Sequence, residues 1–328
     1  MVSLLVWHVG PDRIWGAAGQ VGAVGVLFVL WPSVAMYVCE AYGWKLTLGA
    51  YAEAVSFLRL LAVRTAGEVV NMTTPIAYVG GEPLKAYLLK RDGVPFVDGL
   101  ASVILAKTVM TIAQVLFILT GIALAFWLVG HDQSGGQMAV ASVVSAALLL
   151  FGIAGFVVVQ RWGLFAGGLQ VLRRVNLHVP YLEARESQLR ELDQTILNFY
   201  TADRPRFLLS TVCFLAGWLF EAVEVWVMLA VLGQPVTVGA SLAIGGLSSL
   251  IKGGTFFIPG SLGPQDAGNL LLVTAFGYSE VAGITFALLR RFREIVWIVV
   301  GLGCLALLGG RGIVATAGES GVASPDSR

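Results

Sequence analysis

Long stretches with almost no charge are the feature that most limits the folds open to this chain. Gly16–Val38 and Met138–Gln160 carry no charged residue, and Val97–Val129 contains an apolar span interrupted by Lys107. A fourth apolar stretch runs over Phe207–Leu232. Crossing the roughly 30 Å hydrocarbon core of a bilayer takes about 20 apolar residues. Because backbone polar groups find no water there, such segments must be helical. The sequence therefore predicts an all-α, polytopic integral membrane bundle.

The composition agrees with this prediction. Hydrophobic residues make up 57% of the chain and charged residues 12%, whereas soluble domains carry about 25% charged residues. We expect one transmembrane domain over 1–311, followed by a disordered tail over 312–328 that is rich in glycine, serine and alanine. The net charge of +1 does not indicate a nucleic-acid partner. The three cysteines have no metal-binding spacing and the three histidines are scattered, so we expect no metal and no cofactor.

The basic residues predict an orientation in a bacterial inner membrane. The regions 40–92 and 161–206 carry six and seven Lys/Arg residues, whereas the short loops 130–137 and 233–236 carry none. By the positive-inside rule, the two charged regions are cytoplasmic. Within the second, Tyr181–Tyr200 has the pattern of an amphipathic surface helix. The apolar stub at 2–9 is too short to cross, which suggests that Met1 is an internal methionine or that the first helix has degenerated.

Two distant segments interrupt apolar sequence in the same way. The first reads Asn71-Met72-Thr73-Thr74-Pro75 and then Gly80-Gly81-Glu82-Pro83, and the second reads Phe257-Ile258-Pro259-Gly260 and then Gly263-Pro264-Gln265-Asp266. Proline and glycine end helices, and a carboxylate at membrane depth is costly. Interrupted hydrophobic segments at matching places in two halves point to the binding site of a transporter. We therefore expect two broken, re-entrant helix hairpins that are related as a weak internal repeat.

Each break has a functional and a simpler interpretation. A helix that begins near Pro83 would direct its N-terminus, with Lys85 one turn inside, toward an anionic headgroup phosphate. Alternatively, this segment is an ordinary cytoplasmic loop, in which Glu82 only begins a helix. Asp266 is likewise suited to cap a helix N-terminus. A simple cap does not explain the cluster of glycine and proline around it.

Charged residues also occur inside apolar sequence. Glu221 and Glu224 lie three apart, on one face of a spanning helix, and buried carboxylates need partners. The cations within apolar sequence are Lys107, Lys252, Arg290 and Arg291. Three interpretations stay open for the acids: a structural ion-pair network that includes Lys252, coupling to protons or cations, and a headgroup cavity. The charged segment 290–294 is predicted at a membrane interface, although at membrane depth it would have to face a cavity or an anion.

At the two breaks the sequence resembles the flippase-like transmembrane domain of lysylphosphatidylglycerol synthases, a family that includes stand-alone relatives associated with hopanoid or glycolipid pathways. The resemblance covers about 15–308. It implies movement of lipids between leaflets, with core motif positions at Asn71, Pro75, Gly81, Glu82, Pro259, Gly260, Gly263 and Asp266. Asp266 stands where a glutamate is more usual, and Lys107 where many relatives have arginine. The aminoacyl-transferase domain of the synthases is absent, so lipid aminoacylation is not expected.

Together these observations favour a lipid flippase, not an enzyme, that moves an anionic or modified polar lipid through a polar cavity between the hairpins. The expected partners are membrane lipid and enzymes of lipid biosynthesis. Two alternatives are an accessory subunit of a lipid- or glycan-synthesis pathway and a membrane-embedded enzyme acting on lipid. The predicted substrate-binding residues are Asn71, Pro75, Gly80, Gly81, Glu82, Lys85, Lys107, Pro259, Gly260, Gly263, Gln265, Asp266, Arg290 and Arg291.

Overall fold

The fold comes from a computed structural model, which describes residues 11–73, 80–129, 167, 186–201, 203–255, 258 and 261–309. Every regular element in these residues is helical, and they contain no strand. The α-helices are α2 (Pro11–Thr47), α3 (Phe57–Thr73), α4 (Gly81–Leu89), α5 (Phe96–Val129), α9 (Glu186–Thr201), α10 (Arg204–Val231), α11 (Val238–Gly254), α12 (Pro264–Ala275) and α13 (Glu280–Leu307). Two short 3-10 helices are η1 (Gly49–Tyr51) and η2 (Lys90–Asp92). The predicted span at 138–160 and the tail at 312–328 lie outside these residues.

Four long helices form the frame of the bundle. They are α2, α5, α10 and α13, with 37, 34, 28 and 28 residues. Within the described chain, α5 and α10 are long and apolar enough to cross a membrane, with hydropathies of 2.3 and 1.8. They cover two of the apolar stretches from which membrane spans were predicted. In the bundle α10 packs against α2 and α5, and α13 packs against α2 and α3.

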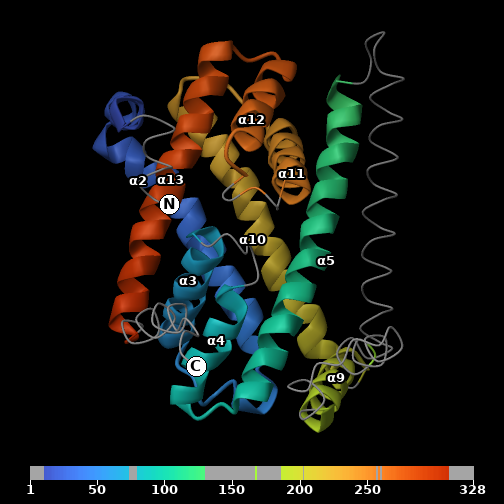
Figure 1. The fold of residues 1–328 in the computed structure, drawn as a ribbon. Helices are drawn as coiled ribbons and strands as arrows, with labels where there is room; N and C mark the ends of the chain where they lie inside the picture. Colours follow the sequence, from blue (N-terminus) through green and yellow to red (C-terminus); the bar gives the residue numbers. More distant parts are fainter. Residues whose placement is uncertain are drawn as a thin grey trace, which may run out of the picture.

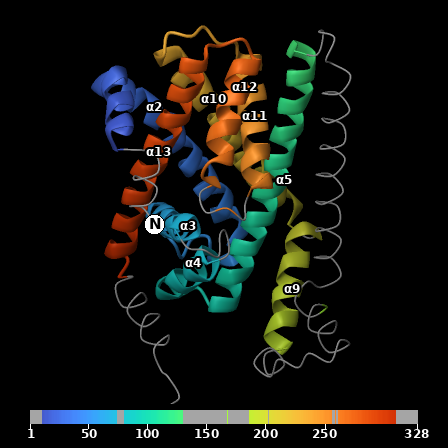
Figure 2. The ribbon, with the colours of Figure 1, turned by 45° about the horizontal axis from the view of Figure 1, so that its top comes forward.

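Two pairs of shorter helices fill the frame. In both views α3 and α4 lie in its lower half, whereas α11 and α12 lie in its upper half (Figures 1 and 2). These four helices have 17, 9, 17 and 12 residues. At 1.5 Å per residue the longest reaches about 26 Å, which is less than the roughly 30 Å of bilayer hydrocarbon. Each break that was predicted from proline and glycine therefore separates the two helices of a pair.

The first pair packs closely because glycines face each other across it. A side chain at Gly81 would clash with the carbonyl oxygen of Gly67 and would lie 2.7 Å from Oδ1 of Asn71. The Gly81 amide instead donates a hydrogen bond of 2.7 Å to that Oδ1. Asn71 thus satisfies a free amide at the start of α4, where helical backbone leaves donors unpaired.

Two apolar clusters lie on either side of a charged layer. One contains Trp44 of α2 and Phe214 of α10, whereas the other contains Val29 of α2 and Val225 of α10. The buried acids of these two helices lie in the interval between the clusters: Glu40 of α2, and Glu221 and Glu224 of α10. A buried charged layer therefore occupies the middle of the bundle.

The segment 290–294 belongs to this middle layer, which corrects the prediction that it lies at an interface. It sits inside the continuous helix α13, about 15 Å from the helix start. The apolar run over 270–289, by contrast, is divided between the helices α12 and α13. Gly277 adopts a φ of 85°, and Ser279 caps α13 by accepting a hydrogen bond of 3.2 Å from the amide of Ala282.

Candidate functional site

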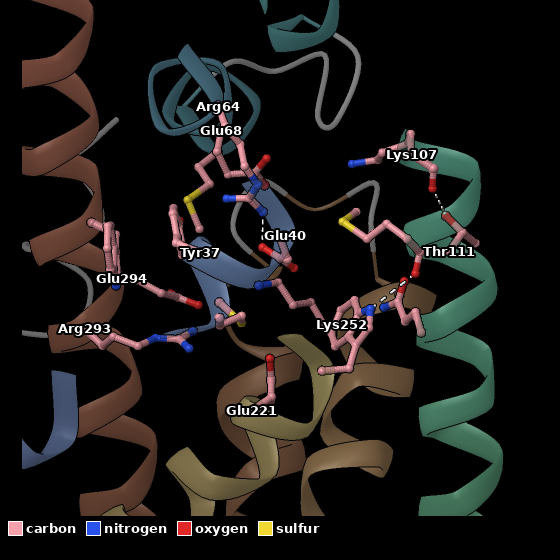
Figure 3. A pocket seen from close by; sticks show the side chains of 17 residues that line it. Tyr37, Glu40, Arg64, Glu68, Lys107, Thr111, Glu221, Lys252, Arg293 and Glu294 are labelled. Atoms are coloured by element: carbon pink, nitrogen blue, oxygen red, sulfur yellow. Dashed lines mark hydrogen bonds and ion pairs between the residues drawn. The ribbon is translucent and has the colours of Figure 1, made fainter. Parts of the chain in front are cut away.

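A cavity of about 260 Å³ opens in the middle layer, between the two helix pairs. Its wall comes from α2, α3, α5, α10, α11 and α13 (Figure 3). Four acids and four bases line it, so the wall is formally neutral: Glu40, Arg64, Glu68, Lys107, Glu221, Lys252, Arg293 and Glu294. So many charges around one space inside an apolar bundle indicate a site for a polar ligand.

Most of the uncharged residues in the wall are aromatic residues or methionines, and the others are Thr111, Gln114 and Gly253. Trp297 stacks on Tyr37 with ring centroids 3.9 Å apart, and its Nε1 donates a 2.8 Å hydrogen bond to Oγ of Ser33. Trp218 donates to the carbonyl oxygen of Met110 at 3.2 Å. Met36, Met72 and Met110 also line the cavity. Methionine adapts to irregular shapes, so this side of the cavity suits an apolar group of variable form.

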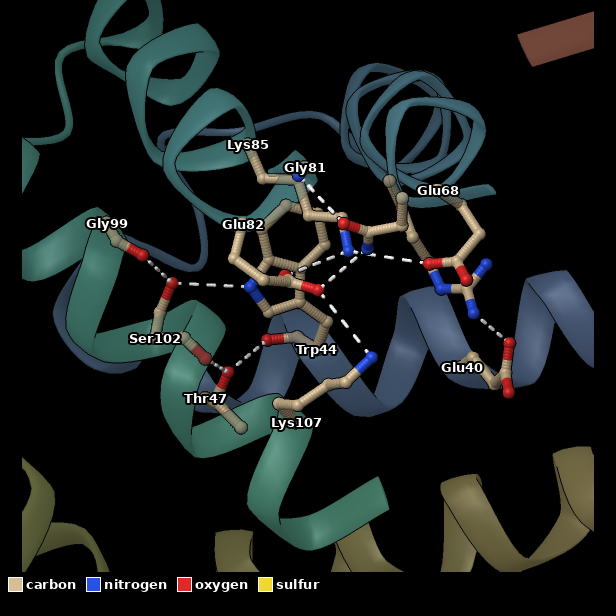
Figure 4. Close-up of polar contacts among 12 residues, drawn as sticks. Glu40, Trp44, Thr47, Glu68, Gly81, Glu82, Lys85, Gly99, Ser102 and Lys107 are labelled. Atoms are coloured by element: carbon tan, nitrogen blue, oxygen red, sulfur yellow. Dashed lines mark hydrogen bonds and ion pairs between the residues drawn. The ribbon is translucent and has the colours of Figure 1, made fainter. Parts of the chain in front are cut away.

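Glu82 is the centre of the polar contacts around the first pair. Its Oε1 accepts a hydrogen bond of 2.9 Å from Asn71 and lies 3.6 Å from Nζ of Lys107. Its Oε2 accepts a hydrogen bond of 3.0 Å from Lys85, whose Nζ also lies 3.7 Å from Glu68 (Figure 4). Because Asn71 also binds the Gly81 amide, these contacts hold α3, α4 and α5 together at the break.

The arginines of α13 tie three neighbouring helices together. Arg290 donates to Glu221 of α10 and to Ser248 of α11, and its Nε lies 3.6 Å from Glu224. Ser248 in turn donates to Oδ1 of Asn269 in α12 at 2.7 Å. Arg293 donates to Glu224 at 2.5 Å. Glu221 and Glu224 are therefore both in ion pairs.

Arg291 holds the start of α12. It donates to the two carboxylate oxygens of Asp266 at 2.7 and 3.1 Å, and to Glu294 at 2.6 Å. The same Asp266 accepts a hydrogen bond of 3.2 Å from the amide of Gly263, which has a φ of 90°. Asp266 thus caps α12 and also joins it to α13.

The eight charged side chains that line the cavity differ in how closely they are paired with other residues. Glu40 pairs with Arg64, whose guanidinium also lies 4.6 Å from the ring centre of Tyr37. Nζ of Lys252, a half-buried residue, has no hydrogen bond or ion pair with the described part of the chain. Within the described part of the chain, Glu68 forms one ion pair, with its carboxylate 3.7 Å from Nζ of Lys85. Lys252 and Glu68 are therefore the two charges most open to a ligand.

The structure brings only some of the predicted residues to this cavity. Lys107, Glu221 and Lys252 line it. Glu82 and Lys85 line a smaller neighbouring cavity of about 30 Å³. Arg290 and Arg291 are each 2% exposed and form ion pairs. The remaining described positions lie at the two breaks and line neither cavity: Asn71, Gly80, Gly81, Gly263, Gln265 and Asp266. Pro75, Pro259 and Gly260 lie outside the described residues.

Sequence reasoning missed several residues of the wall. Glu40 follows the first apolar stretch and was assigned to a loop region, although α2 continues through it to Thr47. Arg64 and Glu68 were counted among loop charges as well. Their spacing of four residues places them on one face of a helix, which was a usable signal. Within the described chain, no group of histidine, cysteine and acidic residues is arranged to hold a metal ion.

Comparisons with known proteins agree with the resemblance noted from the sequence. The family model of the lysylphosphatidylglycerol synthase TM region matches residues 1–303. A UPF0104 membrane protein of Methanothermobacter thermautotrophicus is 23% identical over 318 residues, which cover 93% of this chain and 91% of the relative. A second protein of that name from the same organism is 28% identical over 264 residues, covering 74% and 69%. No solved structure matches the chain.

Proposed function

The chain belongs to the family of the lysylphosphatidylglycerol synthase TM region, a family of membrane proteins, and from this premise we propose that it moves polar lipids between the leaflets of a membrane. The observation that carries this proposal is the charged cavity in the middle of the bundle, whose wall includes Lys252, a residue with no ion pair in the described part of the chain. A charged side chain at the centre of a bilayer costs at least about 2.5 kcal/mol. A purely structural bundle would have little reason to keep such a cavity, whereas a headgroup path needs one.

The two helix pairs suggest how a headgroup gains access. In the proposal they are re-entrant hairpins, related as a weak repeat, that enter the membrane from opposite sides and meet at the cavity. Met72 near the end of α3 and Gly253 near the end of α11 both line it. The headgroup would cross at this level while the acyl chains stay in the bilayer. Lys252 would attract the phosphate.

The proposal includes a location and an orientation. It places the chain in a bacterial inner membrane, with the charged regions 40–92 and 161–206 on the cytoplasmic side. The first pair would then enter from the cytoplasm and the second from outside. In this proposal the chain is a transporter and not an enzyme, and enzymes of lipid biosynthesis supply its substrate.

Leaflet exchange in liposomes tests this function. The purified protein is reconstituted into liposomes with a fluorescent phospholipid, and a membrane-impermeant reductant then reports the fraction that reaches the outer leaflet. We expect exchange well above that of protein-free liposomes, and a severalfold loss in Lys252→Gln. Lys90→Gln is the matched control because Lys90 is exposed and lines neither cavity.

Three outcomes would contradict the proposal. Folded protein that exchanges none of the phospholipids tested would favour an accessory role in lipid synthesis. Conversion of the lipid into a new product would instead identify an enzyme. Equal losses in both lysine variants would show that the cavity is not the path.

A further inference from the structure

We propose that the cavity selects a dipolar headgroup, in which a phosphate binds Lys252 and a positively charged amine binds Glu68. This inference rests on the proposed function and names its substrate class: phospholipids whose headgroup has no net charge. It follows from which charges of the wall already have partners, from the space beside Lys252, and from the neutrality of the wall as a whole.

Most charges of the wall have a partner that a ligand could not replace without leaving a buried charge unpaired. Glu40, Glu221 and Glu294 each accept a hydrogen bond from an arginine, and their side chains are only 5%, 10% and 5% exposed. Arg293 is paired with Glu224, and Lys107 lies near Glu82. Removing one partner of a buried pair leaves the other charge uncompensated, which is strongly destabilising. A ligand is therefore expected to leave these pairs in place.

Glu68 differs from the other three acids. Its side chain is 21% exposed, the most of the four, and its distance of 3.7 Å from Lys85 is longer than a hydrogen bond. Lys85 lies closer to Glu82, at 3.0 Å. A ligand amine at Glu68 would therefore leave Lys85 with a carboxylate partner. Among the acids of the wall, Glu68 is the one that can turn to a ligand without leaving a buried cation unpaired.

Lys252 has open space beside it. It lies in the last turn of α11 and is followed by Gly253 and Gly254, and Gly253 lines the cavity. Among the described residues, a Cβ on either glycine would meet nothing within 4 Å. Glycine is less favourable than alanine in a helix, yet the packing of the described chain does not require it here. The space is thus available to a group bound by the lysine.

The two residues project into the same cavity from different walls, Glu68 from α3 and Lys252 from α11 (Figure 3). The wall as a whole is formally neutral. An anionic headgroup would pair with Lys252 and leave an excess negative charge in the bundle. A cationic headgroup would pair with Glu68 and leave an excess positive charge. A dipolar headgroup satisfies both residues and keeps the layer neutral, which matters because uncompensated charge is costly in a medium of low dielectric.

Headgroup selection can be measured as binding, without transport. The purified protein in detergent is titrated with short-chain phosphatidylethanolamine, which is dipolar, with phosphatidylglycerol, which is anionic, and with a lipid whose headgroup has a net positive charge. The rise in melting temperature with lipid concentration gives each Kd. We expect phosphatidylethanolamine to bind at least tenfold more tightly than the other two.

Two variants should change the preference in opposite directions. Glu68→Gln gives the wall an excess positive charge and should make phosphatidylglycerol the tightest ligand. Lys252→Gln gives it an excess negative charge and should favour the cationic lipid. A purely structural role for either residue would lower stability without reordering the three lipids.

A pair of glycine variants tests the space beside Lys252. Gly253→Ala should weaken binding of phosphatidylethanolamine severalfold without lowering the melting temperature. Gly303→Ala is the matched control. Gly303 also lies inside a helix, and no atom of the described residues would come within 4 Å of its Cβ, but it does not line the cavity. Binding of phosphatidylethanolamine to this variant should be unchanged.

The results separate this inference from the proposed function. Equal affinity for all three lipids, tighter binding of phosphatidylglycerol, or an unchanged order in Glu68→Gln would overturn the inference, even if leaflet exchange is observed. Dipolar selectivity that changes as expected, in protein that exchanges no lipid in liposomes, would support the site and refute translocation.

Discussion

Lys252 and Arg64 line the same cavity, yet replacing them should have very different effects on stability. In Arg64→Met, the carboxylate of Glu40 loses its partner while its side chain is only 5% exposed. An uncompensated buried charge of this kind costs about 3–5 kcal/mol. The contact of Arg64 with the ring of Tyr37 is lost too, which adds roughly 0.5–1 kcal/mol. We therefore expect Arg64→Met to be destabilised by about 4 kcal/mol or more.

Lys252→Met should lie within about 1 kcal/mol of the wild type, because this lysine forms no hydrogen bond or ion pair with an acid of the described chain, and the acids Glu221, Glu224 and Glu294 keep their arginine partners. Unfolding by sodium dodecyl sulfate in mixed micelles, followed by circular dichroism, compares the two variants. The double variant Glu40→Gln/Arg64→Met should recover much of the loss, because it leaves no unpaired charge. Equal destabilisation of Lys252→Met and Arg64→Met would refute the view that Lys252 is available to bind a ligand and is not needed for stability.

Three further predictions concern the helix pairs and the orientation. Gly81→Ala should destabilise the protein by about 1–3 kcal/mol, because its methyl group would press against the backbone of α3, and thermal unfolding in detergent measures this. Asp266→Asn should cost about 1–2 kcal/mol, since Arg291 keeps Glu294 but loses its other carboxylate; full stability would show that the contact with α12 contributes little. In a cysteine-free background, single cysteines at positions 90 and 234 should react with an impermeant thiol reagent from opposite sides of the membrane, and labelling from the same side would contradict the proposed orientation.

Local sequence patterns predicted much of the architecture. The apolar stretches at 97–129 and 207–232 became α5 and α10 because largely apolar runs of that length favour continuous helix in a membrane. The proline and glycine clusters separate α3 from α4 and α11 from α12, because neither residue type sustains a helix interior. These are properties of short segments, which sequence alone can reveal.

The composition of the cavity could not be predicted in the same way, because it depends on which helix faces meet. Glu40 and Glu221 lie far apart in the sequence and line one space only after α2 packs on α10. The sequence grouped Lys252 with the candidate ion-pair residues. In the structure the nearby acids Glu221 and Glu294 pair with arginines of α13, and Lys252 forms no ion pair with the residues that the structure describes.

The segment 290–294 shows that a local sequence pattern can also lead to a wrong prediction. Four charged residues within five positions of an apolar sequence suggest the end of a span, so an interface was the natural prediction. Helix α13 continues through them because each arginine finds an acid on a neighbouring helix or one turn away. Tertiary partners offset the cost that burial of these charges would otherwise impose.

Photo-crosslinking tests most directly whether a headgroup enters the cavity. A phospholipid with a photoreactive group on its headgroup, and a matched lipid with that group at the end of an acyl chain, are each irradiated with the protein in nanodiscs, and the attached peptides are identified by mass spectrometry. We predict that the headgroup probe labels the cavity residues Met72 and Met110, and that the acyl-chain probe labels the outward-facing Leu27 and Leu219. Headgroup labelling confined to the ends of the bundle, with none at the cavity, would contradict the proposed path.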